Sequence, residues 1–501
     1  MLRRTAGFAA ALLAVSALVL TACTGGGAPA DTGEPDPNAS ISVRLVLEPT
    51  NLDIRQTAGA ALDQILIDNV YQGLVALSPD QKDIVPRLAS DYTVSADGLT
   101  YTFTVRDGVT FQNGQPLTPQ DVVWSLTTRR DTSTWADSSR LARVQSITAN
   151  GNTVTLQLSQ PDSTLLWNLA GRAGLIFKEG DTVDYKTKTN GTGPFVLGSW
   201  KQGDSITFER NDAYWGPKAL AKEVVFEYIP DNQAALSAAL AGNLDVVTGF
   251  DPTLGDQIKN AGFTLALDLS TDKGTLAMNE KDPALGDIRV RQAIRQAIDH
   301  DAIVKAVGAG QKLCGPIPEL DPGYQDLCGL VPYDPAAAKQ LLAQAGYANG
   351  LTLTLTIPSF YGTTIPQILV SDLAAVGITL TVNSVDFTTW LNDVFTNKNY
   401  QLSYVLHTEA RDFENWANPD YYFTYDNPQV KDLYEQARSA TTPEQADALL
   451  AQAAQIVSKD AAADWLYNGA SVVAVAPGVT GVPTVNVNAR LPLAELAKSH
   501  G

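Results

Sequence analysis

Strand-type and helix-type patterns alternate along almost the whole chain, and this mixture limits its possible folds more than any other feature. Residues 101–105 alternate apolar side chains with threonine, as a half-buried strand does, and residues 154–158 repeat the pattern. Between them, Thr118 and Pro119 begin a segment with helical spacing. We therefore expect a small α+β unit over about residues 76–185 and a mixed α/β (α+β) class for the chain. With 501 residues, the chain is too long for one hydrophobic core and should form two or three domains.

The second half of the chain is richer in helical patterns. Residues 287–307 place apolar side chains at i, i+3, i+4, i+7 and i+8, which predicts one helix with its arginines on the opposite, polar face. Asp334 and Pro335 begin another predicted helix, which Gly346 ends, and Thr442 begins a third. Strand-type runs separate these helices, so the mixed class extends to the second half.

Composition excludes several classes of protein. The chain has 35 Lys and Arg against 54 Asp and Glu, a net charge of -19, so it lacks the cationic surface of a nucleic-acid-binding protein. Outside the N-terminus, no stretch approaches the roughly 18 apolar residues of a membrane span, which excludes a multi-span transporter. Three Cys and three His leave little material for metal or thiol chemistry. Because G-x-S-x-G, H-E-x-x-H and G-x-x-x-x-G-K-S/T are also missing, we expect neither an enzyme nor a cofactor.

Residues 1–22 have the pattern of a secretory signal peptide. Two arginines precede an apolar run, and the sequence LTAC then ends at Cys23. This junction resembles the bacterial lipobox, which implies that Cys23 is diacylated and holds the protein on the outer face of the cell membrane. An ordinary signal peptide with a chance cysteine is the alternative. Residues 23–40 are rich in Gly, Pro and acids and predict a flexible tether, so the folded body should begin near Ile41.

The two remaining cysteines lie in one Pro- and Gly-rich loop. In an oxidising compartment Cys314 and Cys328 can form a disulfide, which would close a loop of about 15 residues and contribute about 3 kcal/mol. Two inert buried thiols are the alternative. Neither interpretation makes these cysteines catalytic.

One segment combines a histidine, charges of both signs and aromatic rings. His407 is followed by Glu409, Arg411, Asp412 and Glu414, and then by Trp416, Tyr421, Tyr422, Phe423 and Tyr425. One imidazole with carboxylates gives only weak support for a metal site. Charges beside aromatic rings suit a pocket that binds a small zwitterion or polar solute. An exposed loop with its own salt bridges is the alternative.

Six segments follow one another in an order typical of one protein family. They are residues 71–80 (YQGLVALSPD), 85–125, 191–216, 234–245 (AALSAALAGNLD), 276–299 and 333–347 (YDPAAAKQLLAQAGY). Together they resemble the extracellular solute-binding proteins of family 5, the oligopeptide/dipeptide-binding lipoproteins of ABC importers. The resemblance covers about residues 41–475, and six motifs in the family's order are far more specific than one.

The resemblance implies a periplasmic-binding-protein-like fold of class II type, with two lobes around a cleft and an extra α+β subdomain on the first lobe. The predicted divisions are 41–75, 186–272 and 476–501 for lobe 1, 76–185 for the subdomain, and 273–475 for lobe 2. Because the chain crosses between the lobes twice, its C-terminal segment should return to the first lobe.

The resemblance also implies a set of ligand-binding residues. In the first lobe they are Glu48, Thr50, Trp135, Gly249 and Phe250, and in the second lobe Phe387, Arg411, Asp412 and Trp416. Asp412 is the best match to the family's amine-binding aspartate, but its spacing to Pro419 is longer than the family's pattern. This departure keeps a non-peptide solute, such as a nickel chelate or a sugar, open beside a peptide.

The function implied by the resemblance is solute capture without chemistry on the solute. A monomer would bind a small solute, a peptide in the leading interpretation, and deliver it to ABC permease subunits that work with an ATPase. Contact with the membrane would be through the lipid anchor alone. The alternatives are a surface ligand sensor or adhesion lipoprotein with the same fold, and a surface enzyme, against which the missing catalytic motifs count.

Overall fold

The structure is a computed structural model that describes residues 33–499. The predicted signal peptide, lipidated Cys23 and the first part of the tether therefore lie outside the described residues. Within residues 33–499, no helix has the length and apolar character needed to cross a bilayer.

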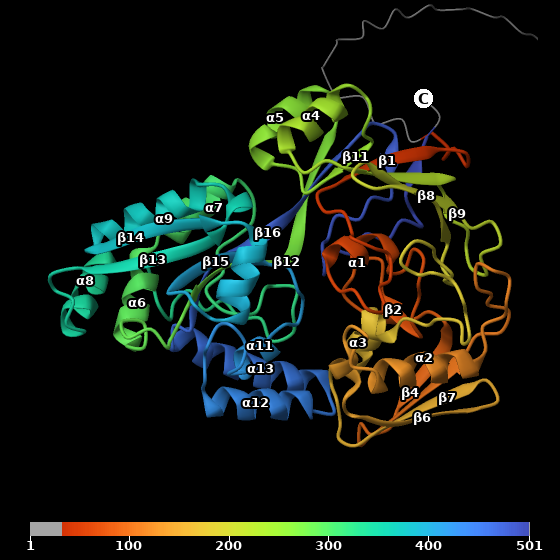
Figure 1. Cartoon of the computed structure of the whole chain (residues 1–501), viewed down its shortest axis with the longest axis horizontal. Coiled ribbons are helices and arrows are strands. Elements are labelled where there is room, and N and C mark those ends of the chain that lie inside the picture. The colour runs from red at the N-terminus through yellow and green to blue at the C-terminus, as the bar shows by residue number, and fades with distance from the viewer. Residues whose placement is uncertain (1–32, 500–501) are drawn as a thin grey trace, which may run out of the picture.

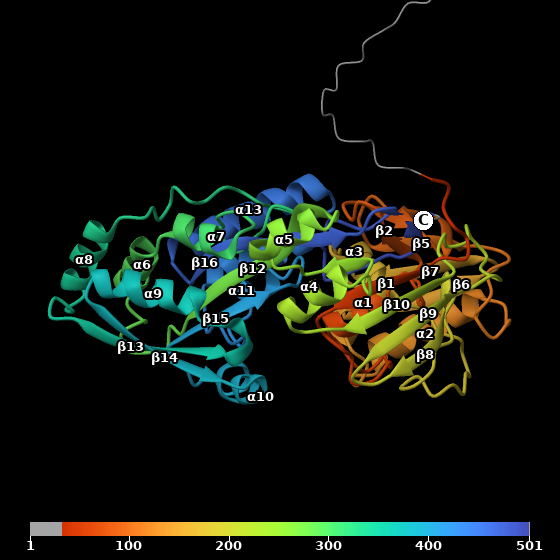
Figure 2. The same ribbon diagram turned by 90° about the horizontal axis from the view of Figure 1, so that it is seen from above.

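A ten-stranded mixed sheet runs through both halves of the molecule, in the order β14-β13-β15-β12-β16-β11-β1-β10-β9-β8. Its strands are β1 (Ser40–Leu45), β8 (Phe195–Lys201), β9 (Ser205–Arg210), β10 (Glu223–Tyr228), β11 (Val246–Thr248), β12 (Thr264–Met278), β13 (Leu351–Pro358), β14 (Ile378–Val385), β15 (Leu402–His407) and β16 (Ala463–Val475). Figures 1 and 2 show β8–β10 in one body and β13–β15 in the other. The long antiparallel strands β12 and β16 connect the two bodies, because β16 also pairs with β11 and β12 also pairs with β15. The molecule therefore has the expected two-lobe architecture.

The first lobe is built around β1, which pairs in parallel with both β10 and β11. The helices of this lobe are α1 (Ala60–Leu66), α4 (Asn232–Leu240), η3 (Pro252–Leu254) and α5 (Gly255–Asn260). Gly191 and Gly193 lie directly against the backbone of residues 69–70, and a Cβ added to Gly191 would come within 1.8 Å of the Val70 carbonyl oxygen. The C-terminal segment packs into the same core through Leu491 and Leu493 and ends in the short ladder of β17 (Val479–Thr480) and β18 (Ala497–Lys498).

A separate four-stranded antiparallel sheet forms the α+β unit that is attached to the first lobe. Its strands are β4 (Ala89–Val94), β5 (Thr100–Val105), β6 (Val144–Asn150) and β7 (Thr153–Leu158), in the order β4-β5-β7-β6. The other elements of this unit are β2 (Val75–Leu77), β3 (Ile84–Pro86), α2 (Pro119–Asp131), η1 (Ser138–Leu141), α3 (Leu165–Ala170) and η2 (Arg172–Gly174). As predicted, Thr118 caps α2, and its side chain forms a capping box with Asp121. The unit has its own apolar core, so it is a true subdomain.

The second lobe surrounds β13–β15 with helices. They are α6 (Ile288–Ala297), α7 (His300–Val307), α8 (Pro335–Gln344), η4 (Ser359–Tyr361), α9 (Thr364–Ala375), α10 (Phe387–Trp390), the π-turn η5 (Leu391–Thr396), α11 (Glu414–Ala417), α12 (Pro428–Arg438) and α13 (Pro443–Lys459). Asp334 caps α8, and Gly346 follows its end with φ 94°, as the sequence predicts.

The prediction of one helix over residues 287–307 is wrong in two respects. Ile298 is extended and Asp299 caps a new helix, so the segment forms α6 and α7. The arginines are not all on a solvated face, because Arg291 and Arg295 are buried. Arg295 pairs with Asp464 of β16 at 3.1 Å, whereas Arg289 stays exposed.

The structure joins Cys314 and Cys328 in a disulfide within the long loop between α7 and α8. The two residues are 14 positions apart in the sequence. The loop they close carries Asp321, which lies beside the candidate site described below.

The lobes also touch at the end of α12, far from the crossing strands. Arg143 pairs with Glu435 at 2.6 Å, and Asp162 pairs with Arg438 at 3.1 Å. Ser163 donates from its backbone N–H and its hydroxyl to the last carbonyls of α12, at 2.8 and 3.0 Å. We call these five residues the interlobe clasp; Figure 1 shows α12 beside the subdomain. The space between the lobes is therefore bounded by the crossing strands on one side and by the clasp on another.

Candidate functional site

Two compartments lie between the lobes, and each is lined by residues from both. The small compartment has a volume of about 150 Å³ and is lined by Asp63, Ile67, Asp137, Arg140, Thr164, Trp167, Asn168, Gly171, Arg172, Ala173, Glu409, Ala410, Arg411, Tyr434, Asn488 and Arg490. The large compartment has a volume of about 700 Å³, and its walls include Tyr92, Val94, Leu166, Ile317, Asp321, Asp412, Phe413 and Leu450. Thr164, Trp167, Arg411 and Tyr434 line both. The segment after β15 therefore lies where the two compartments meet.

An irregularity in the crossing strands places a lysine under this segment. The pairing of β12 with β16 slips between Leu269 and Lys273. The side chain of Asn468 holds the irregularity by donating to the carbonyls of Ser270 and Asp272, both at 2.9 Å. Beyond the slip, Lys273 pairs with His407 at the end of β15. Its side chain therefore reaches the loop that follows His407.

Lys273 and Asp412 form a buried ion pair. The Lys273 ammonium is 3.4 Å from Asp412 and donates to the carbonyls of Glu409 at 2.6 Å and Thr271 at 3.1 Å. Lys273 is 2% exposed and Asp412 is 7% exposed. Burial raises the pKa of the Asp412 carboxyl, and the nearby Lys273 charge offsets this only in part. Asp412 is therefore first of all the counter-charge of Lys273.

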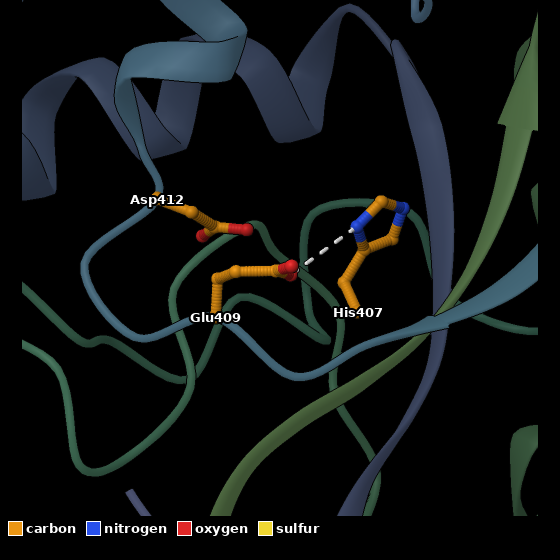
Figure 3. Close-up of side chains that lie close together, drawn as sticks. All are labelled: His407, Glu409 and Asp412. Carbon is orange, nitrogen blue, oxygen red and sulfur yellow. Dashed lines mark ion pairs between the residues drawn. The ribbon is translucent and has the colours of Figure 1, made fainter. Parts of the chain in front are cut away.

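Glu409 is the accessible acid of the segment. Figure 3 shows its carboxylate pointing toward His407 and Asp412, and its oxygen lies 3.9 Å from the His407 Nδ1. The other ring nitrogen of His407 shares a 2.8 Å hydrogen bond with the Tyr422 hydroxyl. The Glu409 side chain is 67% exposed, although protein surrounds it on several sides. Burial by these neighbours raises the pKa of Glu409, but the interaction with His407 outweighs it and lowers the pKa to about 2. Glu409 is thus an ionised carboxylate that a solute can reach.

Arg411 connects the two lobes. Its backbone has φ 54°, and its N–H donates to the Asp321 carboxylate at 2.6 Å. Its guanidinium lies 4.0 Å from the centre of the Trp167 ring, which belongs to the subdomain. No described residue accepts a hydrogen bond from this guanidinium, so its donors are available to an anion. Burial raises the pKa of Asp321 to about 6, even though Lys273 lowers it.

A metal ion is a poor fit to this cluster. His407, Glu409 and Asp412 offer ligand atoms within 4.8 Å of one another. However, the Lys273 ammonium already lies against Asp412, and a divalent cation bound there would be held next to a like charge. The accessible carboxylate of Glu409 better suits an organic cation that approaches from the interlobe space.

A sequence profile identifies the family. The sequence profile described as "Bacterial extracellular solute-binding proteins, family 5 Middle" matches residues 83–424. The chain belongs to this family. Known relatives of this family 5 protein include Heme-binding protein A of Haemophilus influenzae, 29% identical over 350 residues that cover 62% of this chain and 63% of the relative. The dipeptide-binding protein of Escherichia coli K12 is 28% identical over 330 residues, covering 60% and 62%.

Solved structures share the fold over nearly the whole chain. The DppA periplasmic binding protein of Helicobacter pylori, solved with the peptide STSA, has a TM-score of 0.80 at 23% identity and covers 92% of this chain and 98% of that one. By sequence, in contrast, the matched regions span less than two thirds of the length of the curated relatives, 63% and 62% for the two above. The likeness of fold therefore extends further than the likeness of sequence.

Three residues predicted as ligand-binding are buried in cores of the family 5 protein. Trp135 packs edge-on against Phe177 in the first-lobe core, and Phe250 lies in the core beneath α4 and α5. Trp416 stacks on Phe423 at 4.0 Å in the second-lobe core. None of the three lines either compartment in this conformation, so their ligand contact stays a prediction. Their rings are packed against other apolar side chains. The position of an aromatic residue in a motif does not show whether its ring lies in a core or in a cleft.

The other first-lobe predictions lie near the surface but line neither compartment. Glu48 accepts hydrogen bonds from the Trp200 indole at 3.0 Å and from the backbone of Gly203. Thr50 and Gly249 are exposed. In the second lobe, Phe387 is 45% exposed and stacks on Trp390 in a separate aromatic surface. Only Arg411 and Asp412 of the predicted set come together at the compartments.

Several residues that shape the site were not predicted from the sequence. Lys273, Asp321 and Trp167 are the most important of them. A lysine inside a strand-type run, as in DKGTLAM, is the one local signal that could have drawn attention to Lys273. Asp321 and Trp167 carry no such signal, because their roles depend on contacts with Arg411.

Proposed function

We propose that this protein captures a small solute, a peptide in the leading interpretation, between its lobes and delivers it unchanged to the permease and ATPase of an ABC importer. The observation that carries the proposal is the small compartment, where the ionised Glu409 and the available Arg411 of one lobe lie beside Trp167 of the other. The relatives named as peptide- and heme-binding proteins support solute capture, and they leave the class of solute to be tested.

The charges of the small compartment suit a zwitterion. A cationic amine would be attracted to the Glu409 carboxylate, and a carboxylate would fit the forked donors of Arg411. A peptide carries both groups. Two first-lobe arginines of this wall are ion-paired: Arg172 pairs with Asp63 at 2.6 Å and with Asp137 at 2.8 Å, and Arg140 pairs with Glu414 at 2.7 Å. The buried Nη1 of Arg490 has no hydrogen-bond partner among the described residues, so Arg490 could assist Arg411 in holding a carboxylate.

Capture would act through closure of the lobes. A solute that contacts both walls of the compartment stabilises the closed arrangement by its differential affinity for that state. The irregularity at residues 270–272 is the natural place for bending, since ladder pairing is interrupted there in one of the two crossing strands. Because Lys273 follows directly, bending at this point would be transmitted to the loop that carries Glu409.

Glu409→Gln is expected to weaken binding of a cationic solute about 5- to 30-fold, equivalent to about 1–2 kcal/mol after allowing for solvent screening. The solute is first identified by native mass spectrometry of freshly purified protein and is then titrated calorimetrically. The matched control is Asp432→Asn, because Asp432 is an exposed acid of α12 that lines neither compartment. Equal affinity in Glu409→Gln and the control would remove Glu409 from the site. A co-purified metal chelate or sugar would replace the peptide assignment without removing the capture function.

We also propose the cellular setting and the domain divisions predicted above. Cys23 would carry the lipid anchor on the outer face of the membrane, and residues 23–40 would be the tether of a monomer. Pro35 bridges to Ser499, so this tether would leave the first lobe beside the C-terminal end (Figure 1). The mass of the mature N-terminal peptide tests the anchor. A diacylated Cys23 supports it, and an unmodified N-terminus at another residue contradicts it.

A further inference from the structure

The large compartment is an apolar space that the capture of charged groups does not require. Tyr92 and Val94 of β4 and Leu166 of α3 form one wall, and Ile317, Phe413 and Leu450 of the second lobe contribute to the other. Its volume of about 700 Å³ falls in the range of pockets that enclose a drug-sized molecule. The small compartment, at about 150 Å³, is too small for a molecule of that size.

The three buried carboxylates at the large compartment are already engaged. Asp162 pairs with Arg438 in the clasp at 3.1 Å, and Asp412 pairs with Lys273 at 3.4 Å. The Asp321 carboxylate accepts the backbone N–H of Arg411. A cationic group placed here would have to compete with these partners for the buried carboxylates, whereas an uncharged apolar group would bury surface without displacing them.

The contact between Arg411 and Trp167 lies where the two compartments meet. Arg411 lies over the Trp167 ring, and both residues line both compartments. A solute whose charged part is held at Glu409 and Arg411 therefore has the apolar space directly beyond this contact. The interlobe clasp lies at the large compartment, since Asp162, Ser163 and Arg438 are among its lining residues.

We propose that the large compartment is a specificity site for one bulky, uncharged apolar group of the captured solute, either aromatic or branched aliphatic. The inference rests on the proposed function, because it assigns the part of the solute that Glu409 and Arg411 do not hold. It goes beyond that function by predicting which solutes are preferred.

The test fills the compartment and compares peptide probes. In Val94→Trp, an indole replaces a side chain that lines the compartment and is 40% exposed, so no closed core is overfilled. Val94→Glu is a second variant, which adds a charge at the same place. Thr93→Trp is the matched control, since the preceding residue of β4 points to the opposite face of its sheet. The probes are tri-alanine and its three single-phenylalanine derivatives, titrated calorimetrically, with melting curves for every variant.

We expect the wild type and Thr93→Trp to bind at least one phenylalanine derivative about tenfold or more tightly than tri-alanine. Val94→Trp and Val94→Glu should keep the affinity for tri-alanine and lose this preference. A preference that survives in both Val94 variants overturns the inference. So does a wild type that binds tri-alanine and all three derivatives equally.

A separate outcome distinguishes this inference from the peptide assignment. If the wild type binds none of the four peptides, the peptide assignment fails, and the neutral dye Nile red tests the compartment alone. Dye fluorescence enhanced by the wild type and Thr93→Trp, and lost in both Val94 variants, supports an apolar specificity site. Equal fluorescence with all four proteins overturns it.

Discussion

Asp412→Ala is expected to lower the free energy of unfolding by about 3–5 kcal/mol. The Asp412 carboxylate lies 3.4 Å from the Lys273 ammonium, and both side chains are almost fully buried. Removing the carboxylate leaves a positive charge that water cannot reach, with two backbone carbonyls as its remaining hydrogen-bond partners. Denaturant unfolding of the solute-free protein measures the effect.

Two further variants test whether the loss of stability comes from the buried ion pair and not from the removal of any acidic side chain. Asp432→Asn should keep the wild-type stability, because Asp432 is exposed on α12. The double variant Lys273→Met/Asp412→Leu should recover most of the loss, since apolar side chains of similar volume often replace a buried ion pair without cost. If Asp412→Ala unfolds at the same denaturant concentration as the wild type, Lys273 does not need the Asp412 carboxylate. Asp412 would then be free to bind an amine, as the family resemblance implies.

Removing the disulfide with Cys314→Ser/Cys328→Ser is expected to cost about 3 kcal/mol of stability, the value for a closed loop of this length. It should also weaken solute binding, because the loop carries Asp321. The Asp321 carboxylate accepts the Arg411 backbone N–H at 2.6 Å and so helps to hold Arg411 where the two compartments meet. Thermal unfolding and calorimetric titration measure the two effects.

Wild-type protein treated with a dithiol reductant is the companion experiment, and it should reproduce the double variant. Identical melting of oxidised and reduced protein would show that this bond does not contribute to the stability of the fold. If stability falls but affinity is unchanged, the disulfide stabilises only its own loop, and Asp321 is not needed for solute binding.

Local patterns were sufficient for most of the secondary structure. Thr118 and Asp334 begin helices where the sequence predicts, because capping depends on side chains within three residues of the cap. Residues 287–307 were predicted wrongly as one helix. The apolar stripe continues through Ile298, but Asp299 offers its side chain as a new cap, and Arg295 finds a buried partner in Asp464. The periodicity is the same for one helix or two, and the partner is distant in the sequence.

The site was predictable only in part. The segment after His407 was identified from its own charges and aromatic rings, and Arg411 and Asp412 do lie at the interlobe compartments. Trp135, Phe250 and Trp416 were assigned by their place in family motifs, and all three are buried in cores. An aromatic ring has the same sequence signature in a core as in a cleft, since both environments remove it from water.

The sequence by itself determined the mixed class, the family, and the segment that carries the charged groups. These follow from periodicity, caps and ordered motifs, all of which are local in the chain. The tertiary structure alone decided which acid is accessible. Lys273 lies 136 residues before Glu409, and a slip in the pairing of β12 with β16 precedes it in the strand. That register commits Asp412 to Lys273 and leaves Glu409 exposed, because strand pairing, and no local pattern, brings these residues together.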